Sequence, residues 1–390
     1  MKTILKGGVL VDGTGRERVR EAIVVIEGDR IVLVGSRAET SVDESSAQVI
    51  DVTGKTILPG FFNCHAHLAW DGVHDLREQS LNDSPATAAY KSAMNMRRSL
   101  EAGVTTVRDL GVKRNNIYAK EALQKGIVTG PRLLITGEAI AMTGGHTWWC
   151  CREVDGIDGM RQAVREQIKA GADLIKIMPD LTLPELEAGV DEAHRAGKRI
   201  TAHATFDKEV DRVVKAGVDS VEHGGSMSDE IIEMMVNRGV FLVTTFSPVF
   251  LQAEHGHEVG MSEAAIQRRR DQLNDRSSVE GIVKAARAGV KVALGTDAGS
   301  PAVPHNEIAT ELSLLVKFGV CRSTMEALMC ATLRAAELTG LDDKLGTLEE
   351  GKLADIVVVG GDPLAGIEVV RNVDLVFKGG KLLVKEGRLL

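Results

Sequence analysis

The feature that most constrains the fold of this chain is a phrase that recurs through its middle. Each copy consists of an amphipathic segment, a glycine and a short apolar run, with the glycines at Gly103, Gly171, Gly197, Gly217, Gly239 and Gly289. A glycine just past a helix adopts the left-handed conformation that ends it, and a β-branched run after it is typical of a buried parallel strand. Six copies of helix followed by strand predict an α/β architecture.

The strands of the central fold can be counted. The predicted strands are Ile57–Asn63, Val104–Asp109, Arg132–Thr136, Leu174–Met178, Arg199–Ala202, Ser220–Glu222, Val240–Thr245 and Lys291–Gly295. Eight parallel strands close into a (β/α)8 TIM barrel. A doubly wound sheet would have about five or six strands and a glycine-rich phosphate turn after the first one. Because the sequence has no GxGxxG or Walker motif, it favours the barrel.

Both ends of the chain are predicted to be rich in strands and turns. The predicted strands there are Thr3–Leu5, Val9–Val11, Ala22–Ile26, Arg30–Val34, Gln48–Asp51, Ile356–Val359, Leu375–Lys378 and Lys381–Val384. Turn sequences such as Asp12-Gly13 and Gly379-Gly380 separate them. We therefore predict that residues 1–56 and 346–390 form one small β-sandwich domain, and that residues 57–345 form the barrel.

Composition and charge exclude several classes of protein. The 390 residues carry a net charge of −8, and the longest basic tract is Arg268-Arg269-Arg270, so a nucleic-acid partner is not expected. No apolar stretch approaches the ~18 residues of a membrane span, and the first residues do not resemble a signal peptide. Five cysteines without CxxC spacing favour a reducing cytoplasm. A small-molecule substrate is expected, and a homo-oligomer is left open.

Candidate metal ligands stand at the carboxyl ends of predicted strands, where the active sites of such barrels lie. His65 and His67 follow the first strand, His203 the fifth, His223 the sixth and Asp297 the eighth. Two histidines at i and i+2 on an extended chain point to the same side, so both can reach one cation. Imidazole and carboxylate groups suit Zn²⁺, while manganese, cobalt and iron are also compatible with a mixed nitrogen and oxygen site.

Lys176 lies inside the apolar strand Leu174–Met178, where a charged ammonium is costly to bury. An ammonium also has no lone pair to offer a metal. One interpretation is a buried lysine paired with an acidic neighbour. The alternative is that Lys176 loses its charge and gains oxygen atoms, as carboxylation by CO2 would achieve.

Taken together, these residues resemble the amidohydrolase superfamily, in its binuclear subtype with a carboxylated lysine between two metal ions. The resemblance covers nearly the whole chain. Val9–Gly15 is similar to the family's opening strand and turn, Leu58–Asn63 to its approach to the HxH pair, and Gly346–Asp355 to its return into the small β domain.

The resemblance implies two divalent ions, with zinc favoured, and it implies a role for each ligand. It assigns His65, His67 and Asp297 to one ion, His203 and His223 to the other, and a CO2-derived carbamate of Lys176 together with a bridging hydroxide to both. Asp297 would also be the general base. Metal ions lower the pKa of bound water to about 7, which agrees with this chemistry.

Further residues are candidates for contacts with the substrate. Met142–His146 follows the third strand, and His146 could donate a hydrogen bond to the carbonyl oxygen as negative charge develops there. Trp148, next to Trp149, could form an apolar wall. His305 is a candidate for either a substrate contact or orientation of the ligands. We expect Arg108-Asp109, at the end of the second strand, to form an ion pair behind the ligands.

Within the superfamily, the segments around His146, Lys176, His203 and Asp297 are most similar to the Xaa-Pro and Xaa-Arg dipeptidase group. The chain lacks that group's tyrosine for the substrate carboxylate in residues 245–250. Hydrolysis of an amide bond in a small, partly apolar substrate, such as a dipeptide or an N-acyl amino acid, is therefore the expected function. The alternatives are a lactonase or esterase on the same site, a heterocycle deaminase, which Lys176 argues against, and a scaffold without activity, which the full set of ligands argues against.

Overall fold

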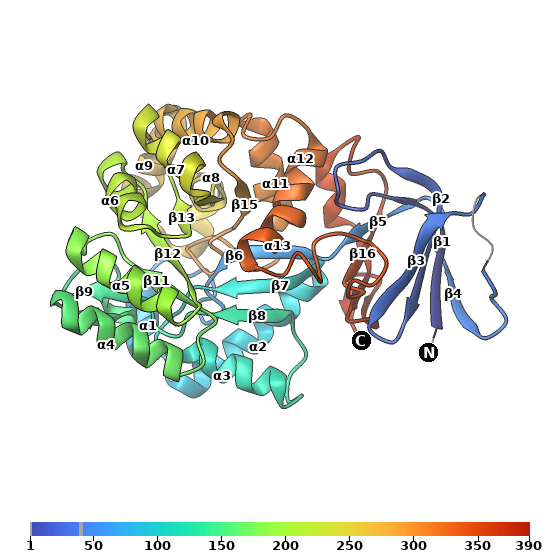
Figure 1. The fold of residues 1–390 in the computed structure, drawn as a ribbon, viewed down its shortest axis with the longest axis horizontal. Coiled ribbons are helices and arrows are strands. Elements are labelled where there is room, and N and C mark those ends of the chain that lie inside the picture. Colours follow the sequence, from blue (N-terminus) through green and yellow to red (C-terminus); the bar gives the residue numbers. More distant parts are fainter. Residues whose placement is uncertain (1, 39–41) are drawn as a thin grey trace.

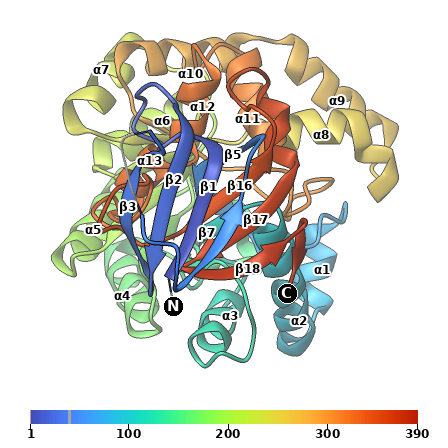
Figure 2. The same cartoon turned by 90° about the vertical axis from the view of Figure 1, so that its right-hand side faces the viewer.

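The computed structural model describes residues 2–38 and 42–390 and contains an α/β body next to a β sheet built from both ends of the chain (Figure 1). The strands of the terminal sheet are β1 (Lys2–Leu10), β2 (Val19–Glu27), β3 (Arg30–Ser36), β4 (Ala47–Asp51), β5 (Lys55–Pro59), β16 (Ile356–Gly360), β17 (Val373–Lys378), β18 (Lys381–Lys385) and β19 (Arg388–Leu389). Figure 2 shows this sheet facing the viewer, with the N- and C-termini at its lower edge.

The two ends of the chain meet where β5 pairs with β16, and hydrogen bonds link all nine strands into one sheet. Two strands predicted separately, Thr3–Leu5 and Val9–Val11, are the two halves of β1. The register of β1 against β2 shifts between Lys6 and Leu10. The first part of β1 pairs with β4 and its last residues pair with β5. Since one sheet contains all nine strands, the predicted two-layered sandwich is not confirmed.

The body is α/β with parallel sheets, as the sequence predicts. Its strands are β6 (Phe61–Ala66), β7 (Val104–Asp109), β8 (Arg132–Ile135), β9 (Ile140–Met142), β10 (Arg152–Val154), β11 (Leu174–Ile177), β12 (Arg199–Ala204), β13 (Ser220–His223), β14 (Phe241–Thr244) and β15 (Val292–Leu294). They form a three-stranded sheet, β6-β7-β8, and a seven-stranded sheet, β10-β9-β11-β12-β13-β14-β15.

The two parallel sheets are not joined into one closed ladder, but backbone hydrogen bonds link them in two places. In one place, the amide of Asp173, just before β11, donates to the carbonyl of Ile135 on β8 at 2.8 Å. In the other, the amide of Asp297 donates to the carbonyl of His65 at 2.8 Å. This second link brings the end of β15 next to the HxH segment.

Helices pack around the parallel strands in Figure 1. They are α1 (Leu76–Asn82), α2 (Pro85–Glu101), α3 (Asn115–Gln124), α4 (Gly156–Lys169), α5 (Leu183–Arg195), α6 (Asp207–Ala216), α7 (Asp229–Arg238), α8 (Ser247–His255), α9 (Glu263–Asn274), α10 (Ser277–Ala288), α11 (Ile308–Lys317), α12 (Thr324–Cys330) and α13 (Leu333–Thr339). Short 3₁₀ turns are Trp148–Cys150, Gly256–Val259 and Ile367–Arg371. The glycines of the repeated phrase end their helices as predicted; Gly217, for example, caps α6 at φ 96°.

The first predicted strand of the body, Ile57–Asn63, is divided at Gly60 into β5 of the terminal sheet and β6 of the body. The amide of Gly60 donates to the carbonyl of Asp355 at 2.8 Å. A Cβ atom on Gly60 would lie 2.2 Å from the hydroxyl oxygen of Thr105, so only glycine allows the two segments to approach this closely. The predicted limits of the domains at residues 56 and 346 stay predictions. Among the described residues, no helix has the length and apolar character needed to cross a membrane.

Candidate metal centre

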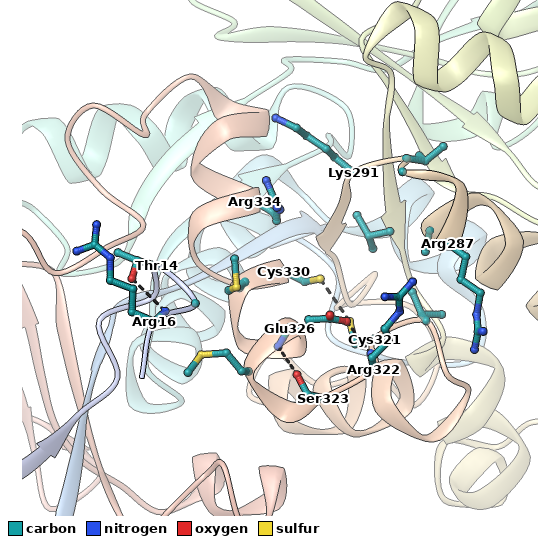
Figure 3. A pocket seen from close by; sticks show the side chains of 18 of the residues that line it. Thr14, Arg16, Arg287, Lys291, Cys321, Arg322, Ser323, Glu326, Cys330 and Arg334 are labelled. Carbon is teal, nitrogen blue, oxygen red and sulfur yellow. Dashed lines mark hydrogen bonds between the residues drawn. The ribbon is translucent and has the colours of Figure 1, made fainter. Parts of the chain in front are cut away.

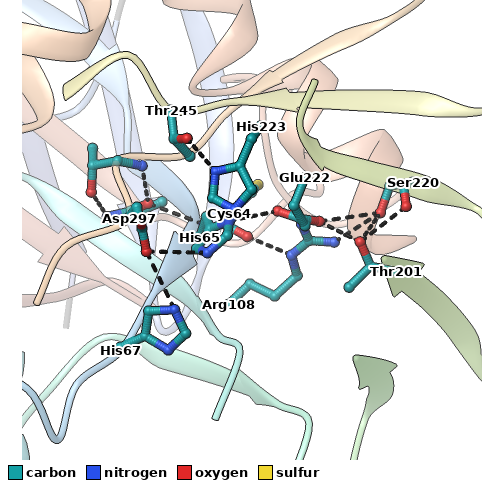
Figure 4. Close-up of polar contacts among 12 residues, drawn as sticks. Cys64, His65, His67, Arg108, Thr201, Ser220, Glu222, His223, Thr245 and Asp297 are labelled. Carbon is teal, nitrogen blue, oxygen red and sulfur yellow. Dashed lines mark hydrogen bonds and ion pairs between the residues drawn. The ribbon is translucent and has the colours of Figure 1, made fainter. Parts of the chain in front are cut away.

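His65, His67 and Asp297 converge at the carboxyl ends of β6 and β15 (Figure 4). The Nε2 atoms of both histidines lie 3.3 Å from Oδ1 of Asp297. One potential ligand atom from each of the three residues lies within 4.8 Å of the other two. Burial by itself would raise the pKa of Asp297, but the two histidines hold it well below its usual range, so the group is a carboxylate. Two imidazoles and a carboxylate whose ligand atoms face one common position form a donor set that suits a divalent transition metal.

The backbone around Asp297 is constrained to make this approach possible. Asp297 has a φ of 53°, a left-handed conformation that aspartate tolerates better than most residues do. Two residues earlier, a Cβ atom on Gly295 would lie 2.6 Å from Cβ of His65. A side chain at position 295 would therefore separate β15 from β6. Positive φ values outside glycine are costly and cluster at functional sites, which agrees with this location.

Each histidine is oriented by a hydrogen bond to its second ring nitrogen. Nδ1–H of His65 donates to Oε2 of Glu222 at 2.8 Å, and Nδ1–H of His67 donates to the carbonyl of Gly111 at 2.8 Å. These acceptors place a proton on Nδ1 of each ring, and Nε2 of each ring faces Asp297, where it can bind an ion when the ring is neutral. Partners of this kind set the tautomer of metal-binding histidines in proteins.

His203 and His223 form a second group next to the first. The centroids of their rings are 4.4 Å apart, and the ring of His223 is 4.7 Å from that of His65. Nδ1 of His223 is hydrogen-bonded to the hydroxyl of Thr245 at 2.6 Å. Burial lowers the pKa of both histidines well below the usual value, and neighbouring positive groups lower it further. Both rings are therefore neutral and have a lone pair available for an ion.

Lys176 on β11 is almost completely buried, and its Nζ atom has no hydrogen-bond partner among the described residues. Burial lowers the pKa of Lys176 to about 8, although the carboxylates of Glu222 and Asp297 act in the opposite direction. The acidic neighbour expected in one interpretation does not pair with it. A buried amine without a partner fits a group that is completed by added oxygen atoms. This orphaned nitrogen and the donor set around it are therefore compatible with a bound pair of divalent ions.

Glu222 is the centre of a buried polar network behind the histidines (Figure 4). The predicted Arg108-Asp109 ion pair is wrong: the guanidinium of Arg108 donates to Oε1 of Glu222 and, at 2.5 Å, to the carbonyl of Cys64. Neighbouring residues on a strand point to opposite faces, so Arg108 and Asp109 cannot pair. Burial by itself would raise the pKa of Glu222, but Arg108 and the hydrogen bond from His65 lower it below the usual value.

The three predicted substrate-binding residues have different environments. His146 stands next to His203, with 4.5 Å between ring centroids. Trp148 is 37 % exposed, and the guanidinium of Arg77 lies 5.5 Å from the centre of its ring. His305 is buried, and its Nε2–H donates to the carbonyl of Trp70 at 3.0 Å. These substrate contacts stay predictions.

The sequence did not single out the residues that orient the ligands. Glu222 stands beside His223 in the buried strand β13, and an acidic residue in a buried strand signals a buried partner. Gly111 and Thr245 carry no comparable signal. Trp149, the neighbour of Trp148, is partly buried and packs against a small apolar cluster, with its ring 5.7 Å from that of Trp70. The ring of Trp70 in turn lies 4.5 Å from that of His67.

The fold and this centre define an α/β protein whose candidate metal ligands stand at the carboxyl ends of parallel strands. Residues 56–383 match the model of the amidohydrolase family. Because the match covers most of the chain, the protein belongs to the amidohydrolase family, and it is a hydrolase that acts on carbon–nitrogen bonds.

Three relatives are similar over almost the full length of the chain. Ochratoxinase of Aspergillus niger is 29 % identical over 99 % of this chain and 87 % of its own. The crystal structure of a prolidase complexed with N-methylphosphonate-L-proline is 32 % identical, with a TM-score of 0.88, and covers 99 % of this chain and 100 % of its own. That of a Xaa-Pro dipeptidase with bound methionine in the active site is 29 % identical, with a TM-score of 0.87, and covers 98 % of this chain and 99 % of its own.

Proposed function

We propose that this protein is a metal-dependent hydrolase that cleaves an amide bond of a small, partly apolar substrate such as a dipeptide or an N-acyl amino acid. The observation that carries the proposal is the convergence of His65, His67 and Asp297, with ligand atoms within 4.8 Å of one another. The relatives support the bond type, since a prolidase, a Xaa-Pro dipeptidase and an ochratoxinase are all similar over nearly the whole chain. We also propose that the two parallel sheets correspond to the closed (β/α)8 barrel.

The proposed ions are two divalent cations, with zinc favoured by the donor set. His65, His67 and Asp297 would hold one ion, His203 and His223 the other, and Lys176, as its carbamate, would contribute to both. When bound, the ions would lower the pKa of a water molecule to about 7 and polarise the carbonyl group of the substrate. The unpartnered Nζ of Lys176 supports its part in this set.

Asp297 is the proposed general base. Its carboxylate accepts a proton from the attacking water and delivers it to the nitrogen that leaves, a role that requires an ionised group close to both. The pKa of Asp297, held low by His65 and His67, keeps the group ionised at neutral pH. Its carboxylate lies 3.3 Å from Nε2 of both histidines.

His146 and Trp148 are proposed to contact the substrate. His146 lies in the loop after β9 and beside His203, and its proposed role is to donate a hydrogen bond to a carbonyl oxygen as that oxygen gains negative charge. Trp148 presents a partly exposed ring that could pack against an apolar side chain. His305 is proposed to act indirectly, because its Nε2–H holds the carbonyl of Trp70 and its ring is buried.

The test is a reaction screen with the zinc-loaded protein in bicarbonate. A pooled library of dipeptides, N-acyl amino acids, aryl amides, lactones and nucleobases is incubated with the protein, and mass spectrometry records the change in each mass. Addition of water with cleavage at an amide is the expected result, and the Asp297→Asn variant serves as the matched inactive control. Opening of lactones without amide cleavage would replace the proposal with a lactonase, and exchange of nitrogen for oxygen would replace it with a deaminase.

A further inference from the structure

A cavity of about 780 Å³ lies at the opposite end of β15 from Asp297 (Figure 3). Its walls come from three segments that are distant in the sequence: the loop between β1 and β2, the turn from α10 into β15, and the residues from Val320 to Arg334. Cys321 and Cys330, whose sulfur atoms are 3.6 Å apart, form part of the wall. None of the candidate metal ligands lines this cavity.

The residues that line the cavity carry an excess of positive charge. Five are cationic, namely Arg16, Arg287, Lys291, Arg322 and Arg334, and two are acidic, namely Glu17 and Glu326. The chain as a whole has a net charge of −8, so this local balance is opposite in sign to that of the protein. Such a concentration of one charge raises the local concentration of oppositely charged ligands.

Three of the five cations have no acidic partner within the part of the chain that the structure describes. Lys291 and Arg334 both pair with Glu337, at 2.8 and 3.1 Å. Arg16, Arg287 and Arg322 form no ion pair with any described residue. Figure 3 shows Arg16 at one side of the cavity, and Arg287 and Arg322 together at the other. Glu326 accepts the backbone amide of Arg322 at 2.7 Å, not its guanidinium. The positive charges in the lining outnumber the negative ones and repel one another, and a bound anion would relieve that repulsion.

The loop that carries Arg16 is held firmly against the body. Oδ1 of Asp12 accepts hydrogen bonds from the amide and the hydroxyl of Thr14, at 2.8 and 2.7 Å. The carbonyl of Asp12 accepts the amide of Leu348 at 2.8 Å. A Cβ atom on Gly15 would lie 3.0 Å from the sulfur of Met329 on α12, so the loop packs directly against that helix. The wall of the cavity is therefore already formed without a ligand.

We propose that this cavity binds a small molecule that carries two or more phosphate groups. Guanidinium groups offer paired donors that match phosphate oxygens, and three of them are free of acidic partners. The volume lies within the range of about 300–1,000 Å³ that is typical of small-molecule sites. The cations stand on both sides of the cavity, so a molecule with several anionic groups would reach more of them than a single phosphate would. The ligand bridges the terminal sheet and the α/β body, so its binding stabilises the folded protein.

The experiment measures binding of sodium tripolyphosphate to the metal-loaded protein by isothermal titration calorimetry at low and high salt. The test variant is Arg287→Glu/Arg322→Glu, which reverses two of the unpaired charges. The matched control is Lys169→Glu/Lys208→Glu, which reverses two exposed charges on α4 and α6, away from the cavity. Removal of two charge-assisted contacts is expected to weaken binding at least about tenfold in the test variant, while the control binds like the wild type.

Each outcome decides the proposal. Stoichiometric binding that weakens with salt and is lost in the test variant supports it, as does a rise in Tm with tripolyphosphate that only the test variant lacks. Equal binding by both variants would assign the signal to chelation of the bound metal and overturn the proposal. Citrate that binds as tightly as tripolyphosphate would overturn the assignment to phosphates. If circular dichroism shows that the double Glu variant is unfolded, Arg287→Gln/Arg322→Gln replaces it with the same expectation. Hydrolytic activity is measured separately, so failure here leaves the proposed function untouched.

Discussion

Replacement of Glu222 by glutamine tests the buried network that orients His65. Glu222 is completely buried and accepts hydrogen bonds from Arg108, Thr201 and His65. Glutamine has the same shape but only one acceptor oxygen and no charge. If that oxygen faces Arg108, the amide NH₂ group faces Nδ1 of His65. Nδ1 must then accept, so the ring proton moves to Nε2, where it blocks the atom that faces Asp297.

Two separate losses are expected from the Glu222→Gln variant. Arg108 is left as a buried charge without a counter-ion, and breaking a buried pair in this way costs roughly 3–5 kcal/mol. Because glutamine keeps one acceptor for Arg108, we expect the free energy of unfolding of the metal-free protein to fall by about 3 kcal/mol. Loss of the partner that orients a ligand histidine lowers metal affinity by about 10–100-fold.

The assays are urea denaturation of the metal-free protein and zinc binding measured in competition with a chelator. The matched control is Glu121→Gln, because Glu121 is 54 % exposed in its side chain and, among the described residues, pairs only with Lys125 at the end of α3. Its effect on stability should be below about 0.5 kcal/mol. In the double variant Arg108→Met/Glu222→Gln, stability should recover in part while zinc affinity stays low. A Glu222→Gln protein that matches the wild type in both assays would refute the reasoning.

Three further predictions concern single titratable groups. Asparagine tolerates positive φ, so the Asp297→Asn variant should keep the Tm of the wild type. Because asparagine cannot accept the proton, kcat should fall by about 10²–10⁴-fold. An active variant would exclude Asp297 as the general base. Only a neutral amine adds CO2, and the pKa of Lys176 is about 8. With zinc and a fixed concentration of dissolved CO2, the metal-free protein should therefore be reactivated about tenfold faster at pH 7 than at pH 6, and the rate should level off above pH 8. A rate that does not change with pH contradicts this. Burial raises the pKa of Glu311 from 4.5 to about 7. The folded protein therefore holds the Glu311 proton more tightly than the unfolded chain does. Its stability is highest below pH 4.5, where both states are protonated, and this stability is lost as the pH rises through 7. In urea denaturation, the stability of the wild type relative to Glu311→Gln should therefore fall by up to about 3 kcal/mol between these pH values, and a constant difference would rule out the shift.

Most strands of the α/β body could be predicted from the sequence because their signals are local. Val104–Asp109 was predicted with the bounds of β7, and Leu174–Met178 differs from β11 by one residue. An apolar run after a glycine that ends a helix needs no information from elsewhere in the chain. The short strands β9 and β10 were missed, since Ile140–Met142 and Arg152–Val154 contain three residues each and lack that context.

The division of Ile57–Asn63 shows where local signals fail. The segment is uniformly apolar, and nothing in its pattern separates β5 from β6. The break depends on Thr105, which approaches Gly60 too closely for any side chain, and on the carbonyl of Asp355, which accepts the amide of Gly60. Both partners are distant in the sequence, so only the assembled structure reveals them.

The sequence by itself determined the α/β class, the family, and which residues carry metal-binding chemistry at the strand ends, because residue type, strand position and glycine spacing are properties of short segments. Only the tertiary structure decided that Arg108 pairs with Glu222 and not with Asp109. It also decided that, within the part of the chain that the structure describes, Nζ of Lys176 has no hydrogen-bond partner and three arginines without ion pairs come from distant segments to line one cavity. Hydrogen bonds and charge pairs depend on distances of a few ångströms between remote side chains, and those distances exist only after the chain has packed.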